Sequence, residues 1–206
     1  LWFSIIPIET IRGEHLTRPA ERLDLGRLDG LAAPAEVQQA LDRHFEGAWT
    51  LSSLDLIRLD DRVHWRVSGQ HREQSFRRLV EADGRQVSPR LSAAAAEHRA
   101  RSWLVTPAEA RAVEWVEAVE PGSEIRGRDL PVWKVSFEQP ESVNLYLDPW
   151  TGEILARRTA RWRIFDFFWM LHIMDFEARE DFNHPLLQIA AVLGLVIALS
   201  GVILWA

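Results

Sequence analysis

The sequence predicts an α+β protein in which two tandem units, each a helix packed on an antiparallel sheet, lie between transmembrane helices. Three observations predict this class: a charged middle region is bounded by two apolar ends, two central segments match at a constant spacing, and both contain short apolar runs separated by turn sequences. Short alternating runs bounded by turn residues are typical of strands, and a constant spacing indicates an internal repeat.

The C-terminal end is long and apolar enough to cross a membrane. From Leu186 to Ala206 only Gln188 and Ser200 are polar. About 20 such residues, each rising about 1.5 Å, span a hydrocarbon core of about 30 Å. A buried core helix is the alternative, but a core helix of this length normally keeps a polar face. We therefore predict a transmembrane helix over residues 185–206.

The first eight residues are also apolar, apart from Ser4. They are expected to be the end of a truncated first transmembrane helix over residues 1–8, with the numbered chain cut inside both membrane helices. The remnant of a signal peptide is the alternative, although neither a basic region nor a small-residue cleavage site is in view.

Charge close to the membrane predicts the orientation of the middle region. Between Trp169 and Pro185, Arg179 is the only basic residue among several acids. Cytoplasmic flanks are enriched in Lys and Arg, so this flank is typical of the opposite side. We predict a protein of the bacterial inner membrane with its central domain in the periplasm. Four arginines upstream weaken this inference: Arg157, Arg158, Arg161 and Arg163.

Composition limits the classes of function. The chain has no cysteine, so it contains no disulfide, thiolate metal site, iron–sulfur cluster or covalently attached haem. Its 30 acidic and 24 basic residues give a net charge of −6, and no basic patch with interleaved aromatic residues stands out. Nucleic acid is therefore not expected as a partner.

The internal repeat covers residues 33–88 and 105–159. Its strands match at one spacing: Trp65 aligns with Trp133, Val67 with Val135 and Gly84 with Gly152, each 68 residues apart. Segments that begin at Ala33 and Thr106 also resemble each other, with Pro in the first helical turn. These segments are 73 residues apart, whereas the strands are 68 apart, so the loops of the two units must differ in length by five residues. Chance similarity of two amphipathic units is the alternative.

In the second unit, we predict a helix from Pro107 to Val119, capped by Thr106, because its valines recur at helical spacing. Four strands are predicted after it, over residues 123–127, 131–137, 142–148 and 152–158.

The turn "DPWTGE" between the last two predicted strands has a physical rationale. Pro149 presets φ, Gly152 can adopt the left-handed conformation, and Asp148 can accept hydrogen bonds from the turn's own amides. "EADGRQV" predicts the same turn in the first unit.

Residues 162–183 contain too many large aromatic side chains for a solvated helix. Trp and Phe accumulate at the membrane–water boundary, where an amphipathic helix can lie in the plane of the membrane. We predict an interfacial aromatic helix here. Packing under the sheets is the alternative, and opposite faces of the helix can do both.

"VWKVSF" followed by "NLYLDPWTGEIL" resembles the core of the PepSY domain. "RWRIFDFFWMLHIMDFEAREDFNHPLL", which leads into the membrane helix, resembles the PepSY-associated transmembrane proteins of Gram-negative bacteria. The resemblance is clear over residues 130–206 and fainter over the first repeat. It implies a periplasmic α+β domain between membrane helices. Soluble relatives include protease propeptides that bind or inhibit. Some membrane relatives act with flavin reductases or ferric-siderophore reductases, and some of these carry haem b.

The candidate haem ligands are His172 and His184, the only histidines near the membrane. A b-type haem needs two axial imidazoles, and neither of these histidines is deep within a membrane helix. No metal-binding spacing, nucleophile motif or phosphate-binding glycine loop occurs, so a non-enzymatic role is favoured and no cofactor is evident.

Two further groups of residues are candidates for binding. The turn and strands of the second repeat offer a surface for a peptide or partner protein: Trp133, Tyr146, Asp148 and Trp150. The membrane helix carries small residues on one face, against which another helix can pack closely: Ala190, Gly194, Ala198 and Gly201.

Two functions follow as hypotheses. The first is a membrane-anchored, non-enzymatic binding or regulatory module, whose sheet edge or inter-repeat groove takes a peptide or partner protein. The alternative is an accessory subunit of a transmembrane electron-transfer system, with a flavin reductase as partner and haem b as cofactor. Membrane lipid is an expected partner in both cases.

Overall fold

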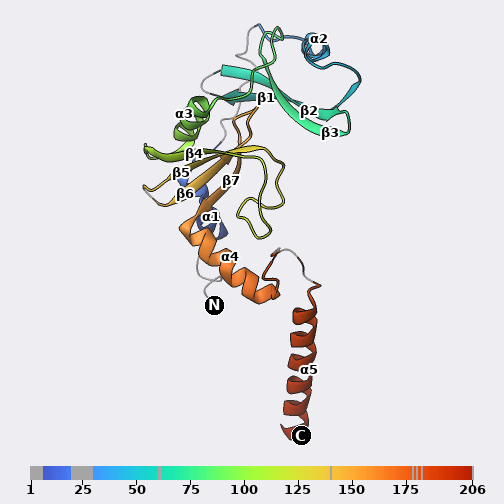
Figure 1. Ribbon diagram of the computed structural model, residues 1–206, viewed down its shortest axis with the longest axis vertical. Coiled ribbons are helices and arrows are strands. Elements are labelled where there is room, and N and C mark those ends of the chain that lie inside the picture. Colours follow the sequence, from blue (N-terminus) through green and yellow to red (C-terminus); the bar gives the residue numbers. More distant parts are fainter. Residues whose placement is uncertain are drawn as a thin grey trace.

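The computed structural model describes residues 7–19, 30–59, 62–139, 141–177, 179, 181 and 183–205. It is elongated: two sheets with their helices form a domain at one end, and a long single helix extends from the other (Figure 1). The elements in chain order are α1 (Ile8–Ile11), the 3₁₀ turn η2 (Glu14–Leu16), α2 (Pro34–His44), β1 (Trp49–Leu59), β2 (Arg62–His71), β3 (Gln74–Glu81), α3 (Ala93–Trp103), β4 (Ala110–Val116), β5 (Val132–Phe137), β6 (Val143–Leu147), β7 (Ile154–Thr159), α4 (Ala160–Ile173) and α5 (Pro185–Trp205).

The first unit consists of α2 and a three-stranded antiparallel sheet in the order β1-β2-β3. Pro34 begins the helix, and the Glu36 carboxylate accepts a hydrogen bond from the Ala33 amide at 2.8 Å. Such a bond satisfies one of the amides that a helix N-terminus leaves unpaired. The apolar face of α2 then packs on the sheet to form a core: Ala32, Val37, Ala40, Leu41, Val67, Phe76 and Val80.

The second unit consists of α3 and a four-stranded antiparallel sheet in the order β4-β5-β6-β7. Ser92 caps α3 by accepting a hydrogen bond from the Ala95 amide at 3.2 Å. Ala96 and Ala100 are fully buried, and their small side chains let the helix lie close to the sheet. The α+β class with two antiparallel sheets is thereby confirmed.

The predicted helix from Pro107 to Val119 is wrong, because β4 occupies residues 110–116 and the helix of this unit is α3. The valines of this segment recur at helical spacing, but Val113 pairs with Val135 and Trp115 with Trp133 on β5. β-branched and aromatic side chains fit such a half-buried pleated surface, and this pairing overrides the local pattern. The strand predicted over residues 123–127 is also wrong, since the structure has turns there.

The other predicted strands are confirmed as β5, β6 and β7, and so is the turn between the last two. Gly152 adopts φ +69°, and Gly84 adopts φ +70° at the corresponding place in the first unit. Asp148 Oδ1 accepts hydrogen bonds from the amides of Trp150 and Thr151, both at 2.8 Å. The side chain therefore holds the turn, as the sequence predicted.

After β7 the chain forms α4, which Thr159 caps by accepting a hydrogen bond from the Trp162 amide at 3.0 Å. The helix ends at Ile173, because Met174 adopts the left-handed conformation with φ +56°. It is therefore shorter than the predicted segment of residues 162–183, and the described residues between Met174 and His184 form turns and loop.

The structure has a helix where the C-terminal transmembrane helix was predicted: α5, with 21 residues. Within the described part of the chain it is the one helix long and apolar enough to cross a membrane, and none of its most apolar stretch is buried against the domain. The predicted first membrane helix falls on residues 1–8, of which residues 1–6 lie outside the described ranges.

We expect position 84 to require glycine for two reasons: its backbone is left-handed, and a side chain there would clash with a neighbouring residue. A Cβ on Gly84 would lie 2.6 Å from the Ala32 Cβ, whereas one on Gly47, at φ +94°, would meet nothing within 4 Å. We expect Gly47→Ala to cost about 1–2 kcal/mol for the left-handed backbone. Gly84→Ala should cost about 1–3 kcal/mol more for overpacking. Denaturation of the detergent-solubilised chain, followed by tryptophan fluorescence, measures both. Equal losses would contradict the packing argument.

Candidate functional site

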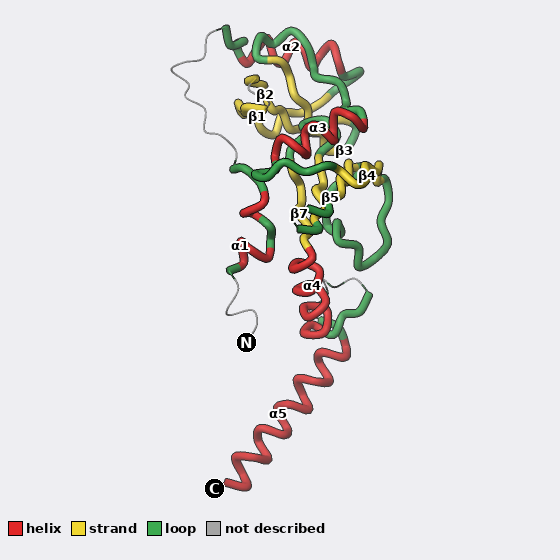
Figure 2. Tube along the Cα trace, turned by 90° about the vertical axis from the view of Figure 1, so that its left-hand side faces the viewer, coloured by secondary structure: helices red, strands yellow, loops and turns green. Residues whose placement is uncertain are grey.

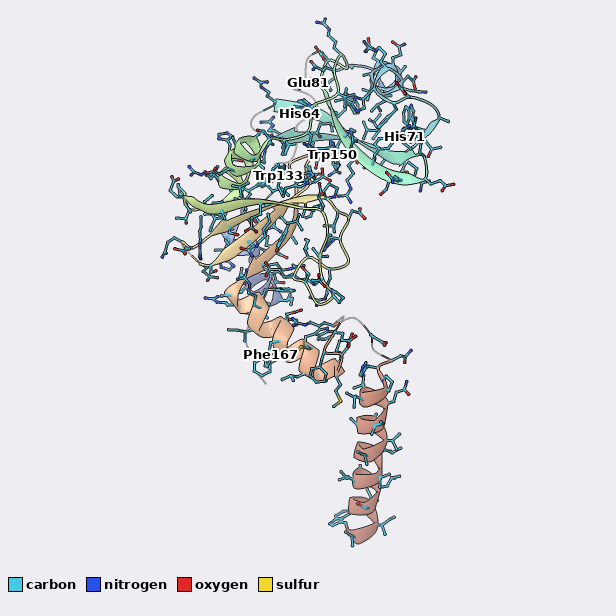
Figure 3. All side chains as sticks on the ribbon, in the orientation of Figure 1. His64, His71, Glu81, Trp133, Trp150 and Phe167 are labelled. Atoms are coloured by element: carbon cyan, nitrogen blue, oxygen red, sulfur yellow. The ribbon has the colours of Figure 1, made fainter. Side chains whose placement is uncertain are left out.

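A groove of about 560 Å³ lies where the first unit meets the second. One wall is the start of β3 with the end of β2, and the other consists of residues 129–131 and the turn at residues 148–150 (Figure 3). The residues that line it are Phe45, His71, Glu73, Gln74, Ser75, Phe76, Arg77, Arg78, Asp129, Leu130, Pro131, Asp148 and Trp150.

Ion pairs hold the two units together beside this groove. Arg66 on β2 lies 2.5 Å from the Glu153 carboxylate, at the end of the DPWTGE turn. Arg77 on β3 lies 2.7 Å from Asp129 and 3.5 Å from Asp148. All three acids of the second unit are thus paired with an arginine of the first.

One backbone edge opens onto the groove. β2 pairs with one side of β3, and on the other side the structure records only the Val80–Val87 bridge within the described ranges. Leu79 O and the Glu81 amide make their hydrogen bonds on that outer side. Because bonding direction alternates along an antiparallel strand, Ser75 and Arg77 also direct their N–H and C=O groups outward. The Gln74–Arg78 part of β3 is therefore a free sheet edge.

Arg78 lies between aromatic rings at the same place. Its guanidinium carbon is 4.4 Å from the centre of the Trp150 ring and 5.7 Å from that of Phe45, and Nη1 donates to the Arg77 carbonyl at 2.8 Å. Burial lowers the pKa of Arg78, and nearby Asp148 partly opposes this effect. A partly desolvated cation held against ring faces is suited to binding a carbonyl or carboxylate oxygen.

The four residues predicted to bind a peptide divide into two pairs. Asp148 and Trp150 line the groove. Trp133 instead lies over the second sheet, where its indole donates to the Leu91 carbonyl at 3.1 Å and its ring centre is 4.9 Å from that of Trp115. Tyr146 is only 3% exposed and lies in the interior of the second unit.

The Tyr146 hydroxyl belongs to a polar network around Glu124, which was not predicted from the sequence. It donates to Glu124 Oε1 at 2.6 Å, and the Asn144 amide donates to the same oxygen. Arg163 Nε on α4 donates to Glu124 Oε2 at 2.9 Å. Burial alone would raise the pKa of Glu124, but the hydrogen bonds from Tyr146, Arg163 and Asn144 outweigh it and hold this pKa below its ordinary value of 4.5.

A second carboxylate, which is buried, joins α4 to its surroundings. Asp166 is 4% exposed and lies 2.6 Å from Arg126, in the β4–β5 connection, and 2.5 Å from Arg179, in the segment before α5. No local sequence signal points to either network, because the partners lie 13 to 40 residues apart. Buried acids with several charged partners hold elements together strongly, since removing one partner leaves an uncompensated charge.

The candidate haem ligands lie at the two ends of the segment between α4 and α5. His172 is exposed in the last turn of α4, and Nδ1 of His184 accepts a hydrogen bond from the Leu186 amide at 3.3 Å. α5 carries no histidine, methionine or tyrosine, so it offers no axial ligand inside the membrane. The described residues contain no group of three or more potential metal-ligating side chains. Haem ligation by His172 and His184 stays a prediction.

The small residues of α5 lie on a helix whose most apolar stretch is not buried against the described part of the chain. A Cβ on Gly194 or Gly201 would meet nothing within 4 Å, and Ala198 is exposed. Packing of another helix against Ala190, Gly194, Ala198 and Gly201 remains a prediction.

The fold and α5 together define a membrane protein with an α+β domain outside the bilayer. The family model described as the PepSY-associated TM region matches residues 33–206, and this chain belongs to that family. No curated protein and no solved structure matches it significantly.

The Glu124 network should stabilise the fold in a pH-dependent way. We expect Glu124→Gln to cost about 1.5–3 kcal/mol at neutral pH, the range for hydrogen bonds to a charged group. Because the pKa of Glu124 is lowered by folding, its stabilisation is present above 4.5 and is lost as the pH falls through the folded-state value. Denaturant unfolding at several pH values should therefore show that the free energies of unfolding of the wild-type chain and the Glu124→Gln variant become equal in acid.

The matched control is Glu114→Gln, whose carboxylate is 52% exposed and pairs with Lys134 at 2.7 Å. An exposed pair of this kind contributes about 0–1 kcal/mol. Equal destabilisation by the two substitutions, or a Glu124→Gln effect that persists unchanged in acid, would contradict the assignment.

Proposed function

We propose that this chain is a non-enzymatic binding or regulatory module of the bacterial inner membrane, with its α+β domain on the periplasmic side. Its ligand is an extended segment of a peptide or partner protein, which adds a strand to the free edge of β3. The observation that carries the proposal is that this edge opens onto a groove with an aromatic and cationic wall.

The backbone supplies the affinity in this mode of binding. Ser75 and Arg77 present outward N–H and C=O groups, and an added strand pairs with such groups along its whole length. The Arg78 side chain already donates to the Arg77 carbonyl, and it would yield this acceptor to an incoming amide.

Side chains around the edge supply the selectivity. Trp150 and Phe45 offer ring faces, and Arg78 lies against both of them. Aromatic and arginine side chains in a partly desolvated pocket are the residue types that dominate the energetics of protein interfaces. A bound segment with an apolar residue beside an acidic or carbonyl group fits this wall.

The charged groups of the groove favour binding over catalysis. Asp148 holds the turn through its Oδ1 and faces Arg77 through its Oδ2, and Asp129 pairs with the same arginine. His71 Nε2 lies 2.9 Å from the Glu46 carbonyl. Each of these titratable groups already has a structural partner, so none is presented to a substrate as a general acid or base.

Peptide binding to the groove can be tested with the full chain in lipid nanodiscs. A phage-displayed library of random peptides is the probe, and recovered peptides are titrated by fluorescence anisotropy. Trp150→Ala should weaken binding by about tenfold or more, because an aromatic anchor contributes at least about 1.4 kcal/mol. Trp115→Ala, which alters a half-buried tryptophan outside the groove, should leave the affinity unchanged.

Methylation of the peptide's own amides separates strand addition from other contacts. Only alternate residues of an added strand bond to β3, so methyl groups on one alternate set of amides should abolish binding and those on the other set should not. The proposal fails if no peptide is enriched over empty nanodiscs, or if bound peptides respond neither to Trp150→Ala nor to methylation.

A further inference from the structure

One face of α4 is apolar and uncovered. Ile164, Phe167, Phe168 and Leu171 are 45%, 50%, 45% and 41% exposed. They stand at positions i, i+3, i+4 and i+7, which places them on one side of the helix, and none of them carries a charge. Phe176, just beyond the helix, is 52% exposed. Large exposed apolar groups gathered in this way mark an interaction surface.

The opposite face of the same helix is held firmly to the domain. Asp166, Met170 and Ile173 are buried there. Asp166 makes its ion pairs to Arg126 and Arg179, and Arg163 binds Glu124. The helix cannot turn its apolar side inward without breaking these pairs, so the exposure of that side is a stable property of the fold.

The helix that carries this face lies close to the start of α5 (Figure 1). α4 occupies the end of the domain from which α5 extends, and α1 lies beside it at the same end (Figures 1 and 2). α4 ends at Ile173 and α5 begins at Pro185, so a short connection separates the two helices. Arg179 in that connection is bound to Asp166 on α4, which keeps the beginning of α5 near α4.

We propose that the exposed face of α4 lies in the interfacial layer of the bilayer that α5 crosses, and that its partner is the lipid surface. We choose the lipid surface as the partner because α4 is tied to the start of α5. A helix tied to the start of a membrane span is at headgroup depth whenever the span is inserted. Helices with one apolar face of Phe, Leu and Ile bury it at the boundary between headgroups and acyl chains. Half-buried Trp162 and Trp169 on the same helix are typical of that depth.

This surface is distinct from the groove and does not depend on it. Phe167 lies on α4, whereas Trp150 lies in the groove between the two units (Figure 3). Docking of α4 would orient the whole domain on the membrane, since α4 is bound rigidly to the second sheet. The groove would then face a defined direction relative to the membrane.

The test uses spin labels, because a chain without cysteine accepts one label at a chosen site. Single cysteines replace Ile164, Phe167, Phe168 and Leu171 in the full chain, which is reconstituted into vesicles of phosphatidylethanolamine and phosphatidylglycerol. Collisions with oxygen, which dissolves in lipid, are compared with collisions with a water-soluble nickel chelate. Leu51→Cys on β1 is the reference for water, and Leu193→Cys in α5 is the reference for lipid; these sites are 53% and 57% exposed.

We expect the four α4 labels to show a several-fold higher ratio of oxygen to nickel collisions than the label at residue 51, and a lower ratio than the label at residue 193. A ratio equal to that at residue 51 would overturn the proposal, because the face would then be in water. Labels immobilised and shielded from both reagents would indicate a protein partner instead. Label–label broadening that disappears on dilution with unlabelled chain would indicate a second copy, and either result would also overturn it.

Discussion

Two carboxylates, the partly buried Glu124 and the buried Asp166, hold the parts of this protein in one arrangement. Glu124 accepts hydrogen bonds from β6 and α4. Asp166 pairs with Arg126, which precedes it in the chain, and with Arg179, which follows it. Each acid is desolvated, so its partners must be in place for the charge to be tolerated. These contacts consequently join the second sheet, α4 and Arg179 in the segment before α5.

The connection between β4 and β5 extends this constraint to the groove. Glu124 and Arg126 at its middle bind α4 and its surroundings, while Asp129 and Pro131 near its end form part of the groove wall. Asp129 also pairs with Arg77 of the first unit. One connection thus contacts the membrane-proximal helix, the second sheet and the edge strand of the first sheet. A ligand that displaces Asp129 would disturb a segment that also holds α4.

The chemistry of the groove supports the proposed binding role. Its backbone edge, ring faces and partly desolvated arginine would recognise the shape and hydrogen-bonding pattern of the proposed peptide. Its acids are already paired with Arg77. Membership of the PepSY-associated TM region family agrees with a membrane-anchored module of this kind. The electron-transfer alternative, with His172 and His184 as candidate haem ligands, stays a prediction.

The sequence by itself determined the features that depend on neighbouring residues: the apolar span of α5, the start of α2 at Pro34, and the turn held by Asp148 and Gly152. Tertiary structure decided β4, because the spacing of its valines predicts a helix, whereas their β-branched side chains favour a strand once β5 supplies the pairing partner. It also decided the groove and the Glu124 and Asp166 networks. Arg66 meets Glu153 across 87 residues, and no local pattern encodes such a contact, since it depends on how two independently formed units pack.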